Sequence, residues 1–353
     1  MYLDKTIPKS IGSYKVLEFI GEGAYGDVFK AESIFLSYPV SIKRILKSKI
    51  PDERSLKRLN REARVISEIS HPNIIRFVEY LCDDHFYYIV TEYFPGSNLL
   101  TYAKSQNEAD YSTIRYILKQ ILLALSYLHS NGVCHRDLKL ENIIIDEKKF
   151  IKLIDFGLCG FDTPFNPQDT FCGSHMYASP EILSSKPYNG AKSDMWSLGV
   201  VLFALIVRKL PWGDHNLPQS IKRIINGHYN IPITIDSNAS DLIKSLLNIV
   251  PEERPTASQA LFHPFFQNGK ITEPTLLSKK PRDLVNQRCL MHWKTANHTT
   301  NEECRKLTGK RHIFSSLKIL VPTSMSYSNP PKPNSKLSSS SSLISRICID
   351  SNA

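Results

Sequence analysis

The spacing of apolar residues predicts that the first part of the chain is rich in strands. Five short segments are expected to form strands, and the first of them alternates between apolar and polar positions, which is the period of a β-strand with one buried face. They are expected over residues 14–20, 28–31, 40–45, 74–81 and 86–92. Three glycines separate the first two segments and predict a hairpin. One helix interrupts the strands over 54–69, where apolar residues recur at helical spacing.

The pattern changes to a helical one after residue 96. Helices are expected over residues 113–128, 191–207, 241–249 and 257–265. The first keeps its apolar residues on one stripe, whereas the second is apolar almost all round in its second half and is expected to be deeply buried. The organisation to explain is therefore a small strand-rich part followed by a larger helical part.

Beyond residue 266 the periodicity mostly fails. Six prolines and the serine run Ser338–Ser342 predict a largely unstructured tail over 267–353. The tail carries 14 basic and 5 acidic residues, a net charge of +9, whereas the whole chain has +10. Residues 1–266, the body of the chain, are thus nearly neutral, and their charge gives no reason to expect nucleic-acid binding.

One segment of the tail has the pattern of an amphipathic helix. Basic residues between 305 and 311 precede apolar residues that share one helical face and end at Pro322. Such a helix could inhibit the body of the chain, bind calmodulin or another partner, or lie on a membrane surface. A flexible, solvated tail is the alternative interpretation.

No segment predicts a transmembrane span or a secretory signal. The longest apolar run, Leu198–Val207, has ten residues, whereas a bilayer-spanning helix needs about 20. The N-terminal residues lack a continuous apolar stretch. Seven cysteines without a C-x-x-C pair are typical of reduced thiols. We therefore expect a cytoplasmic protein, and the basic cluster Lys279–Arg282 is a candidate nuclear address.

The first chemical motif reads G-x-G-x-x-G-x-V and consists of Gly21, Gly23, Gly26 and Val28. It lies between two expected strands, unlike the strand-to-helix loop of a dinucleotide-binding fold. Glycine lets a backbone approach a phosphate closely because it has no Cβ atom. On the next expected strand, Lys43 is a candidate to hold phosphate oxygens, and Glu62 on the following helix is a candidate partner for its charge.

Two further motifs carry most of the functional signal. The segment His135–Asn142 reads H-R-D-L-K-L-E-N, and Asp155–Gly157 reads D-F-G. Together with the glycine-rich motif and Lys43, they resemble the eukaryotic protein kinases over residues 14–266. The number of motifs in the right order makes this resemblance specific.

The resemblance implies an α+β fold in two lobes. Residues 14–93 would form a small β-sheet lobe with one helix, and residues 94–266 a larger, mainly α-helical lobe. Residues 1–13 would then be an N-terminal extension, and 267–353 the basic, Ser/Pro-rich tail. ATP and Mg²⁺ would bind between the lobes.

The resemblance also implies which residues take part in phosphoryl transfer. Lys43 would hold the α- and β-phosphates of ATP, with Glu62 as its partner. Asp137 would accept or orient the proton of the substrate hydroxyl, and Lys139 would neutralise charge on the transferred group. The metal ligands would be Asn142 and Asp155. Such residues suit a reaction that depends on positioning and charge stabilisation.

A larger set of residues would contact the nucleotide. Thr91 would be the gatekeeper, and the backbone of Glu92–Phe94 would hydrogen-bond adenine. Ser41 stands where alanine is usual, so a hydroxyl enters an apolar surface and weakens ATP binding modestly. The expected cofactor-binding residues are Ile20, Gly21, Glu22, Gly23, Ala24, Gly26, Val28, Ser41, Lys43, Thr91, Glu92, Phe94, Glu141, Ile144 and Asp155.

Several residues resemble serine/threonine kinases rather than tyrosine kinases. Lys139 lies two residues after Asp137, and Ser174 matches the hydroxyl that supports such substrates. The segments Thr170–Ser174 and Ser197–Leu205 resemble the calcium/calmodulin-dependent group, and within it the AMP-activated-kinase-like branch. The expected function is transfer of the γ-phosphoryl group of Mg-ATP to serine or threonine in protein substrates. A pseudokinase scaffold that acts through partner binding is the alternative.

The resemblance implies a regulatory pair and two structural anchors. Arg136 precedes the catalytic aspartate, and a phosphate on the activation segment balances such an arginine in the family. Thr170 lies in the matching place, which implies activation by an upstream kinase. Asp194 would anchor the catalytic loop, and Glu181 would pair with Arg254.

Overall fold

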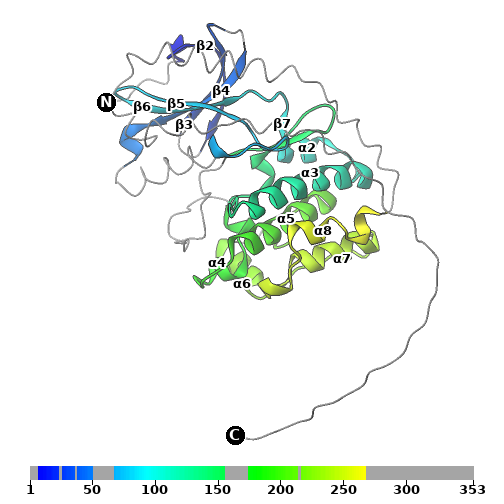
Figure 1. The fold of residues 1–353 in the computed structure, drawn as a ribbon. Coiled ribbons are helices and arrows are strands. Elements are labelled where there is room, and N and C mark those ends of the chain that lie inside the picture. Colours follow the sequence, from blue (N-terminus) through cyan, green and yellow to red (C-terminus); the bar gives the residue numbers. More distant parts are fainter. Residues whose placement is uncertain are drawn as a thin grey trace, which may run out of the picture. The chain divides into compact units, whose positions relative to one another are not determined.

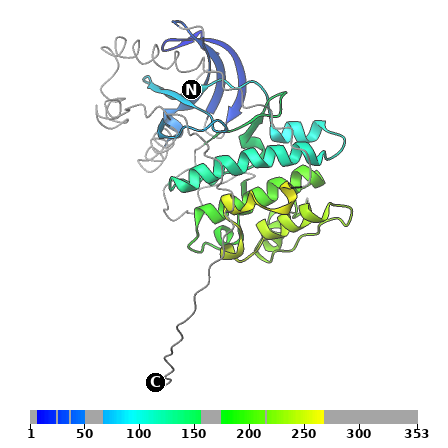
Figure 2. The ribbon, with the colours of Figure 1, turned by 45° about the vertical axis from the view of Figure 1, so that its right-hand side comes forward.

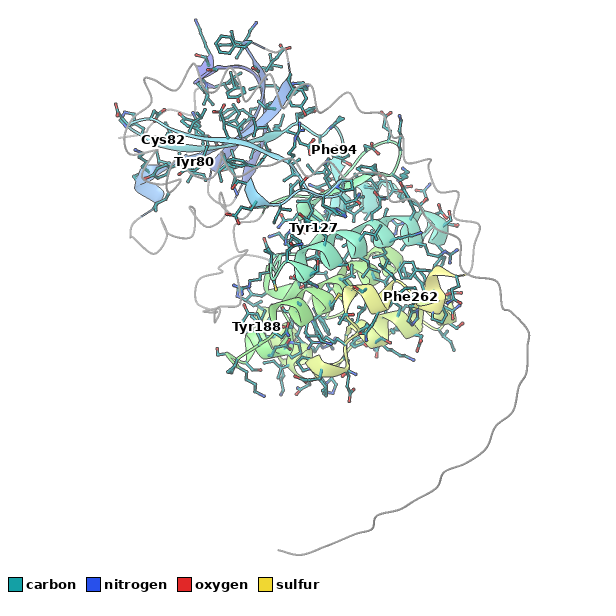
Figure 3. The ribbon with its side chains drawn as sticks, viewed as in Figure 1. Tyr80, Cys82, Phe94, Tyr127, Tyr188 and Phe262 are labelled. Atoms are coloured by element: carbon teal, nitrogen blue, oxygen red, sulfur yellow. The ribbon has the colours of Figure 1, made fainter. Side chains whose placement is uncertain are left out.

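The computed structural model describes residues 7–23, 26–35, 38–50, 67–155, 174–213 and 216–267, which all belong to one compact unit. Strands gather in one region of this unit and helices in the other (Figures 1 and 2). Phe94, labelled in Figure 3, lies where the strands give way to the helices. The predicted order, strands first and helices afterwards, is therefore the order observed.

The first region is a six-stranded antiparallel sheet. Its strands are β1 (Ser10–Ile11), β2 (Tyr14–Gly23), β3 (Gly26–Ser33), β4 (Pro39–Leu46), β5 (Phe77–Cys82) and β6 (Phe86–Glu92). They lie in the order β1-β2-β3-β4-β6-β5, and a short 3-10 helix η1 (Lys47–Lys49) follows β4. This order places the strand of Lys43 between the glycine-rich hairpin and the strand that ends at Glu92.

The two faces of this sheet have different surroundings. One face is buried in an apolar core that includes Phe29, Ala31, Val40 and Ile42. Val28, Ser41 and Lys43 alternate with these residues and lie half-buried on the opposite face. Strand pairing places Lys43 opposite Val28, and Ser41 opposite Thr91. The second face therefore presents the residues that the nucleotide is expected to contact.

The second region is mainly helical and begins with a small sheet. Strands β7 (Ser97–Asn98), β8 (Ile143–Ile145) and β9 (Ile151–Leu153) pair in that order. The α-helices are α2 (Leu99–Ser105), α3 (Tyr111–Ser130), α4 (Pro180–Leu183), α5 (Gly190–Val207), α6 (Leu217–Ile225), α7 (Ser237–Leu246) and α8 (Ala257–Ala260). Short 3-10 helices are η2 (Leu140–Asn142), η4 (Ser174–Tyr177), η5 (Pro251–Glu253) and η6 (Pro264–Phe266).

Helix α5 is the centre of the helical region. It is long and apolar enough to pass a length and composition test for a membrane span, but 83% of its residues are buried inside the protein. Trp196 on this helix stacks on Trp212 with ring centroids 5.6 Å apart and planes 4° apart. The expectation of a deeply buried helix is therefore confirmed, and its apolar surface is used for packing in the core.

Three predicted boundaries differ from the structure for local reasons. Strand β5 begins at Phe77 because residues 74 and 75 pair with β9 instead. Helix α7 begins at Ser237 because the Asp236 side chain accepts a hydrogen bond from the Ala239 backbone and caps it. Helix α8 ends at Ala260, and a turn separates it from η6. Most of the helix expected over 54–69, and the tail after residue 267, lie outside the described residues.

The described cysteines do not share one oxidation state. Cys134 is a buried free thiol. Cys82, at the end of β5, is disulfide-bonded; its place in the sheet is marked in Figure 3. The prediction of reduced thiols is therefore wrong at Cys82, since the spacing of cysteines along a chain does not report which of them the fold brings together.

Candidate active site

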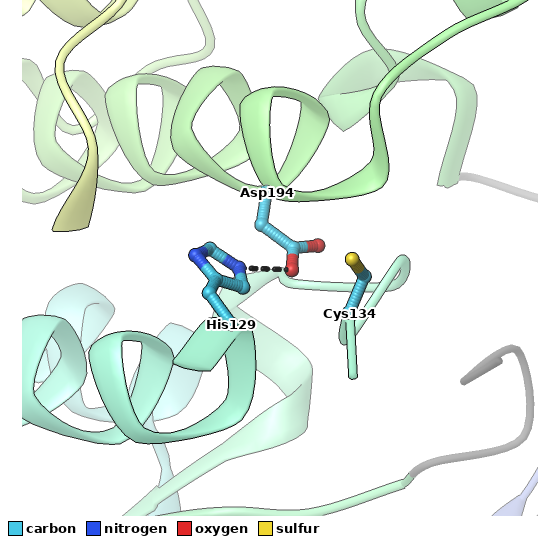
Figure 4. A group of neighbouring side chains, drawn as sticks. All are labelled: His129, Cys134 and Asp194. Atoms are coloured by element: carbon cyan, nitrogen blue, oxygen red, sulfur yellow. Dashed lines mark hydrogen bonds and ion pairs between the residues drawn. The ribbon is translucent and has the colours of Figure 1, made fainter. Parts of the chain in front are cut away.

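The segment between α3 and η2 is irregular, and a carboxylate of α5 holds it in place. Asp194 accepts hydrogen bonds from the backbone N–H groups of His135 (2.9 Å) and Arg136 (2.8 Å). The Nε2 atom of His129 lies 2.9 Å from the same carboxylate, as Figure 4 shows. The buried helix thus fixes the backbone that leads to Asp137, which is the role that the resemblance implies for Asp194.

Cys134 lies beside this group, so the group has the donor types of a metal site. Ligand atoms of His129, Cys134 and Asp194 lie within 4.8 Å of one another (Figure 4). Both Asp194 oxygens already accept hydrogen bonds. Burial raises the pKa of this carboxyl, but its hydrogen bonds and the nearby charges, chiefly those of His129, together outweigh burial, and the pKa lies below its ordinary value. We therefore conclude that this group anchors the segment between α3 and η2.

The side chain of Asp137 is held by two neighbours. Lys139 Nζ and Asn142 Nδ2 each lie 2.8 Å from its Oδ2 atom. Asn142 Nδ2 also donates to the Asp137 carbonyl oxygen at 2.9 Å. Among the described residues none donates to Oδ1 of Asp137, so one oxygen is fixed and the other is available to a substrate. This arrangement suits a group that orients a hydroxyl or accepts its proton.

Lys43 from the sheet meets Asp155 from the helical region. The Lys43 Nζ atom lies 2.9 Å from Asp155 Oδ1. Asp155 has a left-handed φ of 61°, which is uncommon for a residue other than glycine. Burial raises the pKa of its carboxyl, but the nearby positive groups, chiefly Lys43 through its charge and hydrogen bond, together lower it more, and the net pKa lies below the ordinary value. Asp155 is therefore ionised at neutral pH.

Asn142 and Asp155 offer oxygen atoms that fit a magnesium ion. The Asn142 amide nitrogen makes the hydrogen bonds to Asp137, and no described residue occupies its Oδ1 atom. Lys43 binds Oδ1 of Asp155 and leaves Oδ2 without a partner among the described residues. Carboxylate and amide oxygens are the ligand types that Mg²⁺ accepts. The donor set of these two residues thus fits the expected metal.

The expected nucleotide contacts lie on the sheet and on β8. Ile144 is half-buried between Ile143 and Ile145, which are both buried. It alternates with them, so it lies on the face that the core does not cover. A Cβ atom at Gly26 would lie 1.9 Å from the Arg44 carbonyl oxygen. Only glycine therefore permits this close approach of the glycine-rich hairpin to β4.

The motifs and the geometry agree with a comparison against known families. The family model described as "Protein kinase domain" matches residues 14–266. The chain belongs to the protein kinase family. The two-lobed α+β fold expected from the sequence is confirmed, with a β-sheet lobe and a helical lobe.

Curated relatives indicate which protein kinases this domain is similar to. It is 37% identical over 262 residues to the probable serine/threonine-protein kinase MARK-A of Dictyostelium discoideum, covering 74% of this chain and 25% of that protein. It is 40% identical over 259 residues to human NUAK family SNF1-like kinase 2, covering 73% and 41%. With mouse serine/threonine-protein kinase SIK1 it shares 35% over 272 residues, covering 77% and 34%.

These relatives confirm the predicted resemblance to the AMP-activated-kinase-like branch of the calcium/calmodulin-dependent group. The chain spans only about a quarter to two fifths of the length of these relatives. What it shares with them is therefore the kinase domain.

The kinase domain contains a buried ion pair that the motifs did not indicate. Lys152 Nζ lies 2.6 Å from Glu92 Oε1, and both side chains are buried. Lys152 also donates to the carbonyl oxygens of Pro72 (3.0 Å) and Ile74 (3.3 Å). The pair holds the side chain of an expected hinge residue on the core side of the sheet. The feature of the sequence that could have indicated this pair is a lysine within the otherwise apolar run 151–154.

A second buried pair is the one that the resemblance to protein kinases implies. Arg254 donates to both oxygens of Glu181, at 2.6 and 2.8 Å. Arg254 is 1% exposed and also lies over the ring of Trp196, with 5.0 Å from its Cζ atom to the ring centroid. This bidentate geometry joins α4 to the end of the kinase domain.

Not every expected site residue can be placed. Ala24, Glu62 and Thr170 lie outside the described residues, so the pairing of Lys43 with Glu62 and the phosphorylation of Thr170 stay predictions. Glu141 lies exposed on η2. The remaining expected residues, Ile20, Gly21, Glu22, Gly23, Thr91 and Phe94, lie on β2, at the end of β6 or just after it.

Proposed function

We propose that this chain is a serine/threonine protein kinase that transfers the γ-phosphoryl group of Mg-ATP to protein hydroxyls. The observation that carries the proposal is the group of Asp137, Lys139 and Asn142, held beside the Lys43–Asp155 ion pair. Its membership of the protein kinase family and the serine/threonine kinases among its relatives support the same function.

In this reaction the side chains act mainly by position and charge. Asp137 orients the substrate hydroxyl through its open Oδ1 atom and accepts its proton as the hydroxyl oxygen attacks the γ-phosphorus. The bond from that phosphorus to the bridging oxygen breaks, and ADP leaves. Lys139, already beside Asp137, balances negative charge on the transferred group. Lys43 holds phosphate oxygens of ATP. Asn142 and Asp155 would hold a Mg²⁺ ion, which would supply positive charge to the phosphate oxygens.

The protein substrate is proposed to present serine or threonine. Lys139 stands where serine/threonine kinases carry lysine, and the relatives named above are serine/threonine kinases. Phosphorylation of Thr170 by an upstream kinase is proposed as the activating step. The support for it is Arg136, which is half-buried directly before Asp137 and has a left-handed φ of 64°.

The test is phosphoryl transfer from Mg-ATP to a degenerate serine/threonine peptide library, with the full chain and with Asp155→Asn. The wild-type chain is expected to label the library and to reveal its sequence preference. Asp155→Asn should lose at least about a hundredfold in activity, since it removes a charged metal ligand. Thermal unfolding of both proteins controls for folding. Absence of activity in the wild type, after phosphorylation of Thr170, would overturn the proposal in favour of a pseudokinase scaffold.

A further inference from the structure

Arg44 is a buried arginine directly after Lys43 on β4. Its side chain is 9% exposed and points to the core side of the sheet, opposite to that of Lys43. The guanidinium lies between two aromatic rings, with its Cζ atom 4.9 Å from the centroid of Phe29 and 4.8 Å from that of Phe86. Its Nη2 atom donates to Oδ2 of Asp27.

The burial of this charge is costly for the protein. Among the described residues Arg44 Nε has no hydrogen-bond partner although it is buried. A buried ion pair is often no more stabilising than apolar side chains of similar volume, because both charges lose their hydration. The two aromatic rings offset part of that cost. We therefore expect the pair to contribute mainly by fixing the local geometry, and not by stabilising the fold.

The partner of Arg44 belongs to the glycine-rich hairpin. Asp27 lies between Gly26 and Val28, and strand pairing places it opposite Arg44. The neighbouring pair in the same ladder is Val28 with Lys43. The ion pair thus ties one arm of the hairpin to the strand that carries the phosphate-holding lysine.

The charge of Arg44 has a second effect on this hairpin. Glu22 pairs directly with Asp27 across β2 and β3, so two carboxylates share one face of the hairpin. Like charges directly opposite each other destabilise a strand pair. Arg44 neutralises Asp27 and thereby removes this repulsion at the base of the glycine-rich loop.

We propose that Arg44, through Asp27, is a positioning residue that holds the glycine-rich hairpin over the phosphates of ATP. The inference rests on the proposed function, because it assumes that ATP binds at this face of the sheet. Arg44 should therefore affect how the phosphates of the nucleotide are bound and not how its nucleoside part is bound. Adenosine, which lacks phosphates, is therefore the matched probe.

The experiment measures the affinities of Mg-ATP and of adenosine by calorimetry, for the full chain and for Arg44→Met, Asp27→Asn and the double variant. Methionine keeps an apolar chain between the two rings and removes the charge. Glu18→Gln is the matched control, because Glu18 forms an ion pair with Lys30 (3.0 Å) in the same hairpin. Thermal unfolding and the KM for ATP against kcat are measured in parallel.

We expect Arg44→Met and Asp27→Asn each to weaken Mg-ATP binding about tenfold, the size expected when the displaced hairpin loses one charge-assisted hydrogen bond to phosphate. Adenosine affinity should change less than about twofold, and the double variant should bind no worse than either single one. The KM for ATP should rise more than kcat falls. Glu18→Gln should leave the affinity ratio of Mg-ATP to adenosine unchanged.

Three results would count against the inference. Equal losses for Mg-ATP and adenosine would show that Arg44 only maintains the fold, and unchanged affinities for both ligands would show that it does not position the hairpin. If Arg44→Met fails to fold, Asp27→Asn still tests the ratio, and a preserved ratio in that variant overturns the proposal. A wild-type chain that binds no Mg-ATP at all would instead refute the proposed function.

Discussion

At the scale of single residues, each polar side chain of the site uses one atom to hold its position and leaves another atom open. Asp137 receives two hydrogen bonds on Oδ2 and keeps Oδ1 open, and Asn142 donates through its nitrogen and keeps its oxygen. Asp155 binds Lys43 through one oxygen only. Because the fixed atoms set the direction of the open ones, little reorganisation is needed when a substrate binds.

Also at this scale, Thr170→Ala is expected to lower kinase activity by about tenfold or more, because phosphate at Thr170 is proposed to pair with Arg136. The measurement is peptide phosphorylation by the full chain after treatment with an upstream kinase, with phosphate incorporation followed by mass spectrometry. Thr163→Ala, in the same segment, is the matched control and should retain activity. Equal activity of Thr170→Ala and the wild type would exclude this role for Thr170.

At the scale of elements, asparagine and aspartate decide where the longer helices begin. Helices α2, α3, α5, α6 and α7 are each preceded by one of these residues, whose side chain accepts a backbone hydrogen bond from the first turn. Such caps satisfy N–H groups that have no partner within the helix. Helix α3 matters most here, because its last turn carries His129, a partner of Asp194.

Asp110, the cap of α3, leads to a prediction about stability and pH. Its side chain accepts hydrogen bonds from the backbone N–H groups of Ser112 (3.0 Å) and Thr113 (3.3 Å). The Thr113 hydroxyl, chiefly, lowers the pKa of this carboxyl. A lowered folded-state pKa gives stability that is present above the unfolded value of about 4 and is lost as pH falls through the folded value.

Asp110→Ala is therefore expected to lower the free energy of unfolding by about 1 kcal/mol at pH 7. Asp110→Asn keeps a capping oxygen and should lose less. The difference between the wild type and Asp110→Asn should shrink as pH falls below 4. Urea unfolding at several pH values measures both effects, and a difference that stays constant with pH would refute a charged cap.

Periodicity predicted elements well where one face is buried and the chain is regular. Residues 86–92 form a strand with the expected bounds, and α5 begins one residue from its expected start. Periodicity failed for α7, because a cap and not an apolar residue sets its beginning. The motifs predicted the candidate site residues, but they did not predict the Asp27–Arg44 pair. That pair depends on strand register, which the pattern of a single strand does not contain.

At the scale of the whole domain, a few polar contacts join segments that lie far apart in the sequence. Lys43 and Asp155 are 112 residues apart and connect the sheet to the helical lobe. Lys152 connects β9 to the end of β6 and to the backbone of residues 72 and 74. Asp155 follows β9 by two residues, so the contacts of Lys152 also fix the strand that leads to this expected metal ligand.

Lys152→Met is expected to lower the free energy of unfolding by about 3–5 kcal/mol, because it leaves the buried carboxylate of Glu92 without its counter-charge. Adding Glu92→Gln should recover roughly 1–3 kcal/mol of this loss. The glutamine removes the unpaired charge and still accepts the hydrogen bond that Arg76 N donates to Glu92 at 3.0 Å.

Recovery should be incomplete, because the carbonyl oxygens of Pro72 and Ile74 lose the donor that Lys152 supplies. Urea unfolding measures all of these values. Lys148→Met, at an exposed lysine of the neighbouring turn, is the control and should change the free energy by less than about 0.5 kcal/mol. If the double variant is no more stable than Lys152→Met, the unpaired charge of Glu92 is not the cause of the loss. The lost donor and the cavity would then account for it, and the two lobes would be joined here by packing rather than by charge.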